Sequence, residues 1–269
     1  MSLADLTLAR WRSFDASAAH RLAREAADLV DGQVVAVETV EHSGGPLHRV
    51  CVERGGRRFA LVPGGAVSLG FDPERWTPAP GQDADYARSV EQGYGSGPDL
   101  RAHLTLELSP ARTAVLPTVL MAVEDESAED HVTDSLAELP GALAAEGLRL
   151  PSADEWEYGC GAGAGTLFRW GDDCPLDRDP YSDPSGPHQG LNAFGLRIAY
   201  DTYRTELSTD PGSVHGGDGG ESVCGGYGAL LGWLPLATAQ RNAAMAEFVY
   251  GPEGEDAWGD LSLRPVLDL

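Results

Sequence analysis

The hydrophobic period of the chain changes once near its N-terminus, and this change limits the possible fold classes more than any other feature. Residues 17–30 carry apolar side chains at helical spacing and are followed by Gly32, so they predict a helix. The period then falls to two over residues 33–40, 48–53 and 58–62, which predicts three strands. A helix followed by a β-meander indicates an α+β protein.

The middle of the chain predicts further short elements. Residues 72–99 are rich in Pro, Gly and Asp without a sustained period, so we expect a long surface loop there. Residues 101–123 alternate polar and apolar side chains, which predicts a strand pair interrupted at Ser109 and Pro110. Residues 134–146 predict a short helix.

A second short helix is predicted over residues 151–158. Ser152 follows a proline and precedes Glu155 by three residues, which is the pattern of a capping box at a helix start. Beyond this helix, residues 171–226 are rich in Gly, Asp and Pro and predict loops.

The length of 269 residues fits one large domain or one domain with an appendage. We expect residues 1–57, with turns at residues 43–46 and 54–56, to form a helix and β-meander docked on a main domain. That main domain, over residues 58–269, is expected to be α+β with low regular secondary structure. Buried tryptophans and charged pairs would then hold its loops in place.

Acidic residues far outnumber basic ones: 42 Asp and Glu stand against 19 basic residues, for a net charge of −23. All 19 basic residues are arginine, so the chain has no lysine for a phosphate-binding loop or a Schiff base. Without a basic stripe, neither nucleic acid nor an anionic membrane surface is expected as a partner. Since no signal peptide or transmembrane run is apparent, we expect a cytoplasmic location.

The four cysteines are Cys51, Cys160, Cys174 and Cys224, and they show neither zinc-ligand spacing nor a secreted disulfide pattern. A buried free thiol packs as a small hydrophobe, so a core position is the default expectation. Cys174 lies in a Gly-Asp-Asp-Cys loop and is expected to be exposed. Cys224 directly precedes a Gly-Gly turn, where either a reactive thiol or a core thiol at a strand end would fit.

Residues 148–171 read LRLPSADEWEYGCGAGAGTLFRWG. This stretch resembles the signature of the formylglycine-generating enzymes, the sulfatase-modifying-factor superfamily. Weaker matches to that family follow its order along the chain. The resemblance implies the family's C-type-lectin-like α+β fold over residues 58–269. The weaker matches are residues 59–70, 192–196, 225–227, 239–242 and 263–266.

Several residues of the matched segments are interpreted as core architecture rather than as a site. Arginine has a planar fork that suits buried carboxylate pairing, and tryptophan supplies a large apolar anchor. Residues two apart on a helix diverge, so we expect one of Glu155 and Glu157 to pair with an arginine and the other to face solvent. Trp156, Trp170 and Arg264 are expected to be largely buried. The full structural set is Arg149, Glu155, Trp156, Trp170, Arg241 and Arg264.

The resemblance also indicates what this chain lacks. Enzymes of the family bind copper through two cysteines, five residues apart, just after a Gly-Gly-Ser turn. At the corresponding positions this chain has Leu230 and Pro235, whose side chains offer no thiolate for copper(I). The sequence therefore argues against canonical, copper-dependent formylglycine generation. Cys224 is the nearest thiol and is kept as a weak catalytic candidate.

Iron and calcium are the other metals that the superfamily implies. Related sulfoxide synthases bind iron through histidines of an N-terminal helical domain, for which residues 1–57 are too short, and no His-x-x-x-His-x-Glu pattern occurs. Calcium remains a weaker candidate, because Glu206 and Asp210 align with acidic residues of the family's calcium motif and calcium prefers oxygen ligands. The acidic run 216–221 is expected to be a solvated loop. No cofactor is predicted.

Two functions remain open at this level. The first is a non-catalytic relative, a pseudoenzyme that binds a small molecule, a peptide or a protein in a groove beside the Gly-Gly turn. The alternative is an oxidoreductase-type enzyme of the same superfamily, with non-canonical chemistry on a cysteine-containing or small-molecule substrate. The expected groove residues are Tyr227, Leu230, Trp233, Pro235 and Gln240.

Overall fold

The structure is a computed structural model that describes residues 3–42, 45–132, 135–251 and 259–269. In this part the protein is a mixed α+β molecule with 34% helix and 25% strand. These proportions are ordinary for a globular protein. They include the helices and strands of residues 1–57, so they do not test the expectation of low regular content over residues 58–269. No helix in the described ranges is long and apolar enough to cross a membrane.

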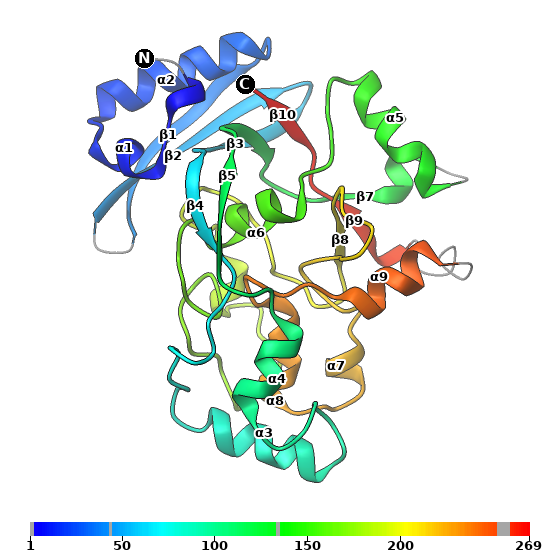
Figure 1. Cartoon of the computed structure of the whole chain (residues 1–269). Helices are drawn as coiled ribbons and strands as arrows, with labels where there is room; N and C mark the ends of the chain where they lie inside the picture. Colours follow the sequence, from blue (N-terminus) through cyan, green and yellow to red (C-terminus); the bar gives the residue numbers. More distant parts are fainter. Residues whose placement is uncertain (1–2, 43–44, 133–134, 252–258) are drawn as a thin grey trace.

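The N-terminal helices pack against the first two strands (Figure 1). Asp15 caps the second α-helix, because its side chain accepts a hydrogen bond from the Ala18 backbone N–H. Trp11 is fully buried and donates from its indole nitrogen to the carbonyl of His48 at 2.8 Å. The helix predicted over 17–30 is confirmed. These elements are η1 (Leu3–Asp5), α1 (Leu8–Ser13) and α2 (Ala16–Leu29).

A five-stranded antiparallel sheet has the order β1-β2-β3-β6-β10. The three predicted strands of the meander are its first three members, and the last two come from the middle and the end of the chain. The two parts that the sequence predicted, residues 1–57 and 58–269, therefore share one sheet. Residues 43 and 44 of the first predicted turn lie outside the described residues. The strands are β1 (Gln33–His42), β2 (Gly45–Arg54), β3 (Arg57–Val62), β6 (Val119–Ala122) and β10 (Val266–Asp268).

Two smaller sheets complete the strand inventory of the described ranges. One pairs β4 with β5 in antiparallel fashion. The other has the order β7-β9-β8, in which β8 and β9 are parallel. Their bounds are β4 (Gly65–Leu69), β5 (Arg112–Leu116), β7 (Glu126–Ser127), β8 (Thr205–Leu207) and β9 (Leu261–Leu263).

The expected surface loop over 72–99 contains a helix instead, α3 (Gln82–Glu91). Its buried face consists of Gln82, Asp85, Tyr86 and Ser89. These residues have the i, i+3, i+4, i+7 spacing of one helix face, but three of them are polar. Because most of this buried face is polar, the pattern of apolar residues alone does not reveal the helix.

The expected strand over 101–108 is also wrong, because this segment forms α4 (Leu100–Glu107). Asp99 caps the helix by accepting from two backbone N–H groups of its first turn. Leu100, His103 and Leu104 share the buried face, whereas Leu106 is 71% exposed. Alternating polar and apolar residues thus concealed a helix with an i, i+3, i+4 face.

The remaining helices are short. The capping box of Ser152 and Glu155 is present at the start of α6, as predicted. Figure 1 shows α3, α4, α7 and α8 gathered at the end of the molecule away from both chain termini. The helix predicted over 134–146 corresponds to η3 and α5, and residue 134 lies outside the described ranges. The bounds are η2 (Ala128–Asp130), η3 (Leu136–Glu138), α5 (Leu139–Ala145), α6 (Ala153–Gly161), η4 (Pro187–Gln189), α7 (Glu221–Cys224), α8 (Ala229–Trp233), η5 (Leu234–Leu236) and α9 (Ala243–Tyr250).

Candidate functional site

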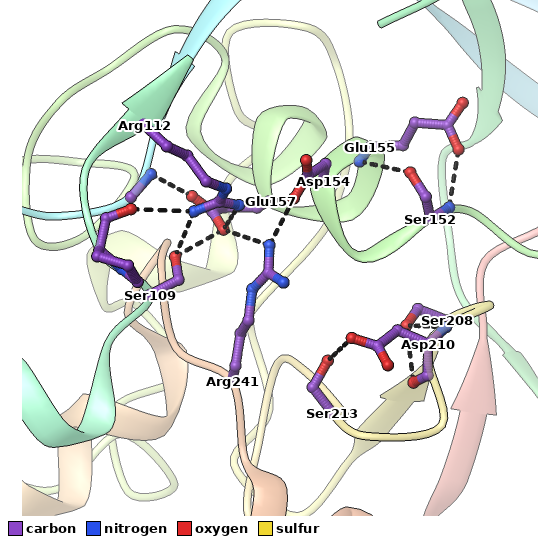
Figure 2. Close-up of polar contacts among 12 residues, drawn as sticks. Ser109, Arg112, Ser152, Asp154, Glu155, Glu157, Ser208, Asp210, Ser213 and Arg241 are labelled. Carbon is purple, nitrogen blue, oxygen red and sulfur yellow. Dashed lines mark hydrogen bonds and ion pairs between the residues drawn. The ribbon is translucent and has the colours of Figure 1, made fainter. Parts of the chain in front are cut away.

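Buried Glu157 of α6 lies at the centre of a partly buried ion-pair cluster (Figure 2). Its Oε2 accepts from Nη2 of Arg112 at 2.9 Å, from Nη2 of Arg241 at 3.1 Å and from the Ser109 hydroxyl at 2.9 Å. Both arginines also donate to Asp154 Oδ1 at 2.6 Å. The expectation that one of the two helix glutamates faces solvent is therefore wrong: Glu157 is buried by its arginine partners.

The other expected arginine pairs lie around the same helix. Arg149 forms a two-pronged pair with Glu155, with N–O distances of 2.7 and 2.8 Å. Arg264 is fully buried and donates to both oxygens of Glu206 at 2.8 and 2.9 Å. The indole N–H of buried Trp156 donates to the same carboxylate at 2.8 Å. These pairs hold α6, β8 and the C-terminal strands together.

Trp170 is less buried than expected. Its ring stacks on Phe168 with a centroid distance of 4.9 Å, but the residue is only partly buried. Its indole N–H donates to the carbonyl of Asp173 at 3.0 Å. Trp170 therefore closes a loop at the surface rather than anchoring the centre of the core.

The two calcium candidates are not brought together into a site. Both oxygens of Glu206 are engaged by Arg264, so this carboxylate is not free for a cation. Asp210 closes a turn by accepting from the Gly212 N–H at 2.9 Å and the Ser213 hydroxyl at 3.3 Å (Figure 2). Within the described ranges, no group of three or more His, Cys, Asp or Glu side chains could hold a metal ion.

The cysteines differ in exposure. Cys160 and Cys174 are buried, and burial raises the pKa of each thiol to about 12. The expectation that Cys174 is exposed is therefore wrong. Cys224 is exposed at the end of α7, with its Sγ 3.1 Å from the hydroxyl of Tyr203.

A cavity of about 310 Å³ lies between α4, α7 and the segment from η5 to the start of α9, beside the Gly-Gly turn. Three of the five expected groove residues, Tyr227, Pro235 and Gln240, line it. Leu230 and Trp233 are instead fully buried in the core, so the expectation that they face the groove is not met. The full lining is Gly95, Ser96, His103, Glu107, Asp218, Glu221, Ser222, Tyr227, Leu231, Leu234, Pro235, Gln240, Asn242 and Ala244.

The backbone at Leu230 is held by a residue of α3. Its backbone N–H, at the start of α8, donates to Asp85 Oδ2 of α3 at 2.8 Å. The other oxygen of Asp85 accepts from Arg88 at 2.6 Å. This contact ties α8 to α3 at the residue whose side chain is fully buried. Neither Leu230 nor Pro235 can supply a soft ligand, so the positions expected for copper ligands do not fit copper(I).

The Tyr227 side of the cavity is built by aromatic stacking. The Tyr227 ring stacks on Tyr94 with a centroid distance of 4.3 Å and an interplanar angle of 24°. Its hydroxyl donates to Glu221 Oε1 at 2.7 Å. A Cβ at Gly225 would lie 2.3 Å from the Tyr227 ring, so this glycine is required for the ring position.

The α4 side of the cavity carries His103 and Glu107. His103 stacks on Tyr86 at a centroid distance of 5.1 Å, and its Nδ1 accepts from the Ser96 N–H at 3.3 Å. This bond assigns the imidazole proton to Nε2. Burial lowers the pKa of His103, so the ring is neutral, and burial raises the pKa of Glu107. The Glu107 carboxylate lies 4.0 Å from His103 Nδ1. Because the ring is neutral, this contact adds little stabilisation to the charged carboxylate.

Two buried acceptors complete the cavity. Asp218 accepts from the Gly220 and Ser222 N–H groups, each at 3.0 Å, and burial raises its pKa. The acidic run 216–221 is therefore not simply the solvated loop that the sequence suggested. Gln240 is 6% exposed, and its Oε1 has no hydrogen-bond partner in the described part of the chain.

Sequence reasoning missed four acidic or imidazole groups of this cavity, Glu107, Asp218, Glu221 and His103. Two of them lie on the helix that was predicted as a strand. The other two lie in the run that was predicted as a solvated loop. The approximate position of the cavity followed from the Gly-Gly turn alone.

No protein-family model matches this chain, and no curated protein matches it either.

Proposed function

We propose that this chain has the formylglycine-generating-enzyme type of fold, with a C-type-lectin-like α+β domain, and acts as a binding module rather than as an oxidase. Contacts among the matched segments support the fold. The Gly70 N–H donates to Glu157 of α6, and the Asn192 amide donates to the carbonyls of Gly159 and Cys160 at 2.6 and 3.0 Å. Segments that are distant in sequence thus converge on one helix, α6.

One observation carries the binding function: the 310 Å³ cavity beside Tyr227 is lined by polar side chains, of which His103, Asp218 and Gln240 are buried, and the two positions expected for copper ligands carry no thiolate. A concave site with a few convergent polar groups on a rigid frame is typical of ligand binding. Tyr227 and Gln240, two of the residues expected to line a groove, contribute to this cavity. The volume suits a small molecule or one side chain of a peptide.

The direct test is an assay for formylglycine. Wild-type protein is incubated with copper(I), oxygen and a cysteine-containing sulfatase peptide, and the aldehyde is measured by mass spectrometry. We expect no aldehyde and no retention of one equivalent of copper after desalting. The Cys224→Ser variant is the matched control for copper bound loosely at the exposed thiol. Aldehyde formation by the wild type would refute the binding-module proposal.

The alternative is an enzyme with non-canonical chemistry on a cysteine-containing or small-molecule substrate. The observation in its favour is the exposed Cys224 thiol beside the Tyr203 hydroxyl. This alternative would be supported by turnover of a cysteine-containing or small-molecule substrate that is lost in Cys224→Ser but kept in Cys51→Ser. If the chain is a binding module, both variants should bind a ligand as the wild type does.

A further inference from the structure

Among the described residues, the cavity beside Tyr227 is lined by three carboxylates, Glu107, Asp218 and Glu221, and by no arginine. The buried carboxylates around α6 have the opposite environment, since Glu157 and Glu155 both pair with arginine. In the described ranges, none of the three cavity carboxylates lies within ion-pair distance of an arginine. Asp218 is buried, Glu107 is partly exposed and Glu221 is exposed, and no positive charge from the described part of the chain balances them.

These carboxylates keep free acceptor capacity. Asp218 accepts one backbone N–H on each oxygen and also a hydrogen bond from the Ser222 side chain, which together do not use all four of its lone pairs. Glu221 accepts the Tyr227 hydroxyl on Oε1 only. Burial raises the pKa of Glu107 and of Asp218, as expected for carboxylates that lack a positive partner.

Gln240 is an independent sign that a donor is missing. Its side chain is almost fully buried at the cavity wall, yet Oε1 has no partner among the described residues. Its backbone is fixed, because the carbonyl accepts from His215 Nδ1 at 3.2 Å and the N–H donates to the Ala237 carbonyl at 3.1 Å. A buried acceptor without a partner is rare in native proteins. A ligand with an N–H donor would satisfy it.

One part of the lining is apolar. Leu231, Leu234 and Pro235 lie on the same cavity as the carboxylates. Such a wall suits a hydrocarbon stem, whereas the acceptors suit a positively charged head. A volume of about 310 Å³ is at the lower end of the range for small-molecule sites.

We propose, on the basis of the binding function proposed above, that this cavity binds an organic cation with N–H donors, an alkylammonium or alkylguanidinium group. Glu107, Asp218 and Glu221 provide the negative charge, and Gln240 Oε1 accepts one N–H. The net charge of −23 favours the approach of cations. The group belongs either to a free small molecule or to a lysine or arginine side chain of a peptide.

The experiment is isothermal titration calorimetry at low ionic strength with agmatine and 1,5-diaminopentane as free probes. A capped arginine peptide and a capped lysine peptide are the second pair of probes, and their citrulline and norleucine counterparts are the uncharged controls. We expect saturable binding of at least one cationic probe and at least tenfold weaker binding of its uncharged counterpart. Tighter binding of the peptides than of the free amines identifies a peptide ligand, and the reverse order identifies a small molecule.

Three variants locate the binding. Glu107→Gln and Glu221→Gln each remove one cavity charge, and the second keeps an acceptor for the Tyr227 hydroxyl. We expect each to weaken cation binding about tenfold, since a hydrogen bond to a charged group contributes on this scale. Glu91→Gln, an exposed position on α3, is the matched control for net charge and should bind as the wild type does.

Failure of this inference and failure of the proposed function give different results. An uncharged probe could bind in a way that Gln240→Leu weakens but Glu107→Gln and Glu221→Gln do not. That result would overturn the cation inference and still support the binding module. Cation binding that is equally strong in both glutamine variants would overturn it as well, and so would the absence of binding by every cationic probe. Formylglycine production would overturn the proposed function instead.

Discussion

Two acidic regions of this molecule use their charges in opposite ways. Around α6, the buried carboxylates of Glu157, Glu155 and Glu206 each meet an arginine within hydrogen-bond distance. In the cavity beside Tyr227, the carboxylates meet none in the described part of the chain. A buried charge needs a partner within the fold. Of the cavity carboxylates, Asp218 is buried, Glu107 is partly exposed and Glu221 is exposed, so a partner can reach them from outside. The comparison separates carboxylates that hold the fold from carboxylates that are available to a ligand.

The largest effect should come from breaking the completed pair at Arg264. Arg264→Met leaves Glu206 buried without its partner, and the carbonyls of Ala122 and Val123 lose the donor that lies 2.8 Å away. We expect the free energy of unfolding to fall by about 3–5 kcal/mol. Urea titration followed by far-UV circular dichroism measures it. Arg75→Met, at an exposed pair with Asp72, is the control and should change stability by less than about 1 kcal/mol.

The next effect is a pH dependence at His215, which lies between the two regions. Its ring stacks on Trp156 at 4.7 Å, and burial lowers its pKa to about 4. In the unfolded chain the imidazole takes up a proton near pH 6.5, whereas in the folded protein it stays neutral down to about pH 4. Stability from this residue is therefore full above pH 6.5 and declines as the pH falls toward 4, by about 3 kcal/mol in total.

His215→Phe removes this titration and keeps an aromatic ring against Trp156. Urea unfolding of both proteins at pH 7 and pH 4.5 isolates the effect, since the other acid-titrating groups are common to both. The wild type should lose more stability than the variant between the two pH values. Equal losses would mean that His215 is protonated in the folded protein.

A smaller effect is expected from neutralising the acid at the centre of the α6 cluster. Glu157→Gln keeps the volume but replaces a charged acceptor of two arginines with a neutral amide. We expect a loss of about 2 kcal/mol, in the range for hydrogen bonds to charged groups. Thermal and urea unfolding measure it, and an unchanged stability would show that the cluster does not depend on its charge.

The smallest effect should come from the same chemical change in the cavity. Glu107 has no arginine partner, and burial raises its pKa, so Glu107→Gln removes no completed pair. We expect a change in the free energy of unfolding within about 0.5 kcal/mol. A loss as large as that of Glu157→Gln would erase the distinction between the two regions.

Strong local patterns in the sequence predicted the α6 side of the molecule. The capping box at Ser152 fixes the helix start, and the meander strands have an unmistakable period of two. Buried arginines such as Arg264 could be paired in advance with carboxylates, because a buried guanidinium requires a partner. The identity of that partner, Glu206, could not be predicted, since it lies 58 residues away in sequence.

The cavity side could not be predicted to the same extent. The buried face of α3 is mostly polar, because Asp85 caps α8 and Gln82 donates to the carbonyl of Asp172 at 2.9 Å. Such tertiary contacts give no apolar period. On α4, the leucines alternate as in a strand, although Leu106 points to solvent. The cavity residues contributed by α4 were therefore assigned to the wrong element.

The most direct test of the distinction between the two acidic regions is the effect of a cation on thermal stability. A ligand that binds only the folded state raises the melting temperature with its concentration. Agmatine should raise the melting temperature of the wild type and of Glu157→Gln, and should raise that of Glu221→Gln much less. An equal rise in Glu221→Gln, or no rise in the wild type, would contradict the assignment of the cavity carboxylates to a ligand.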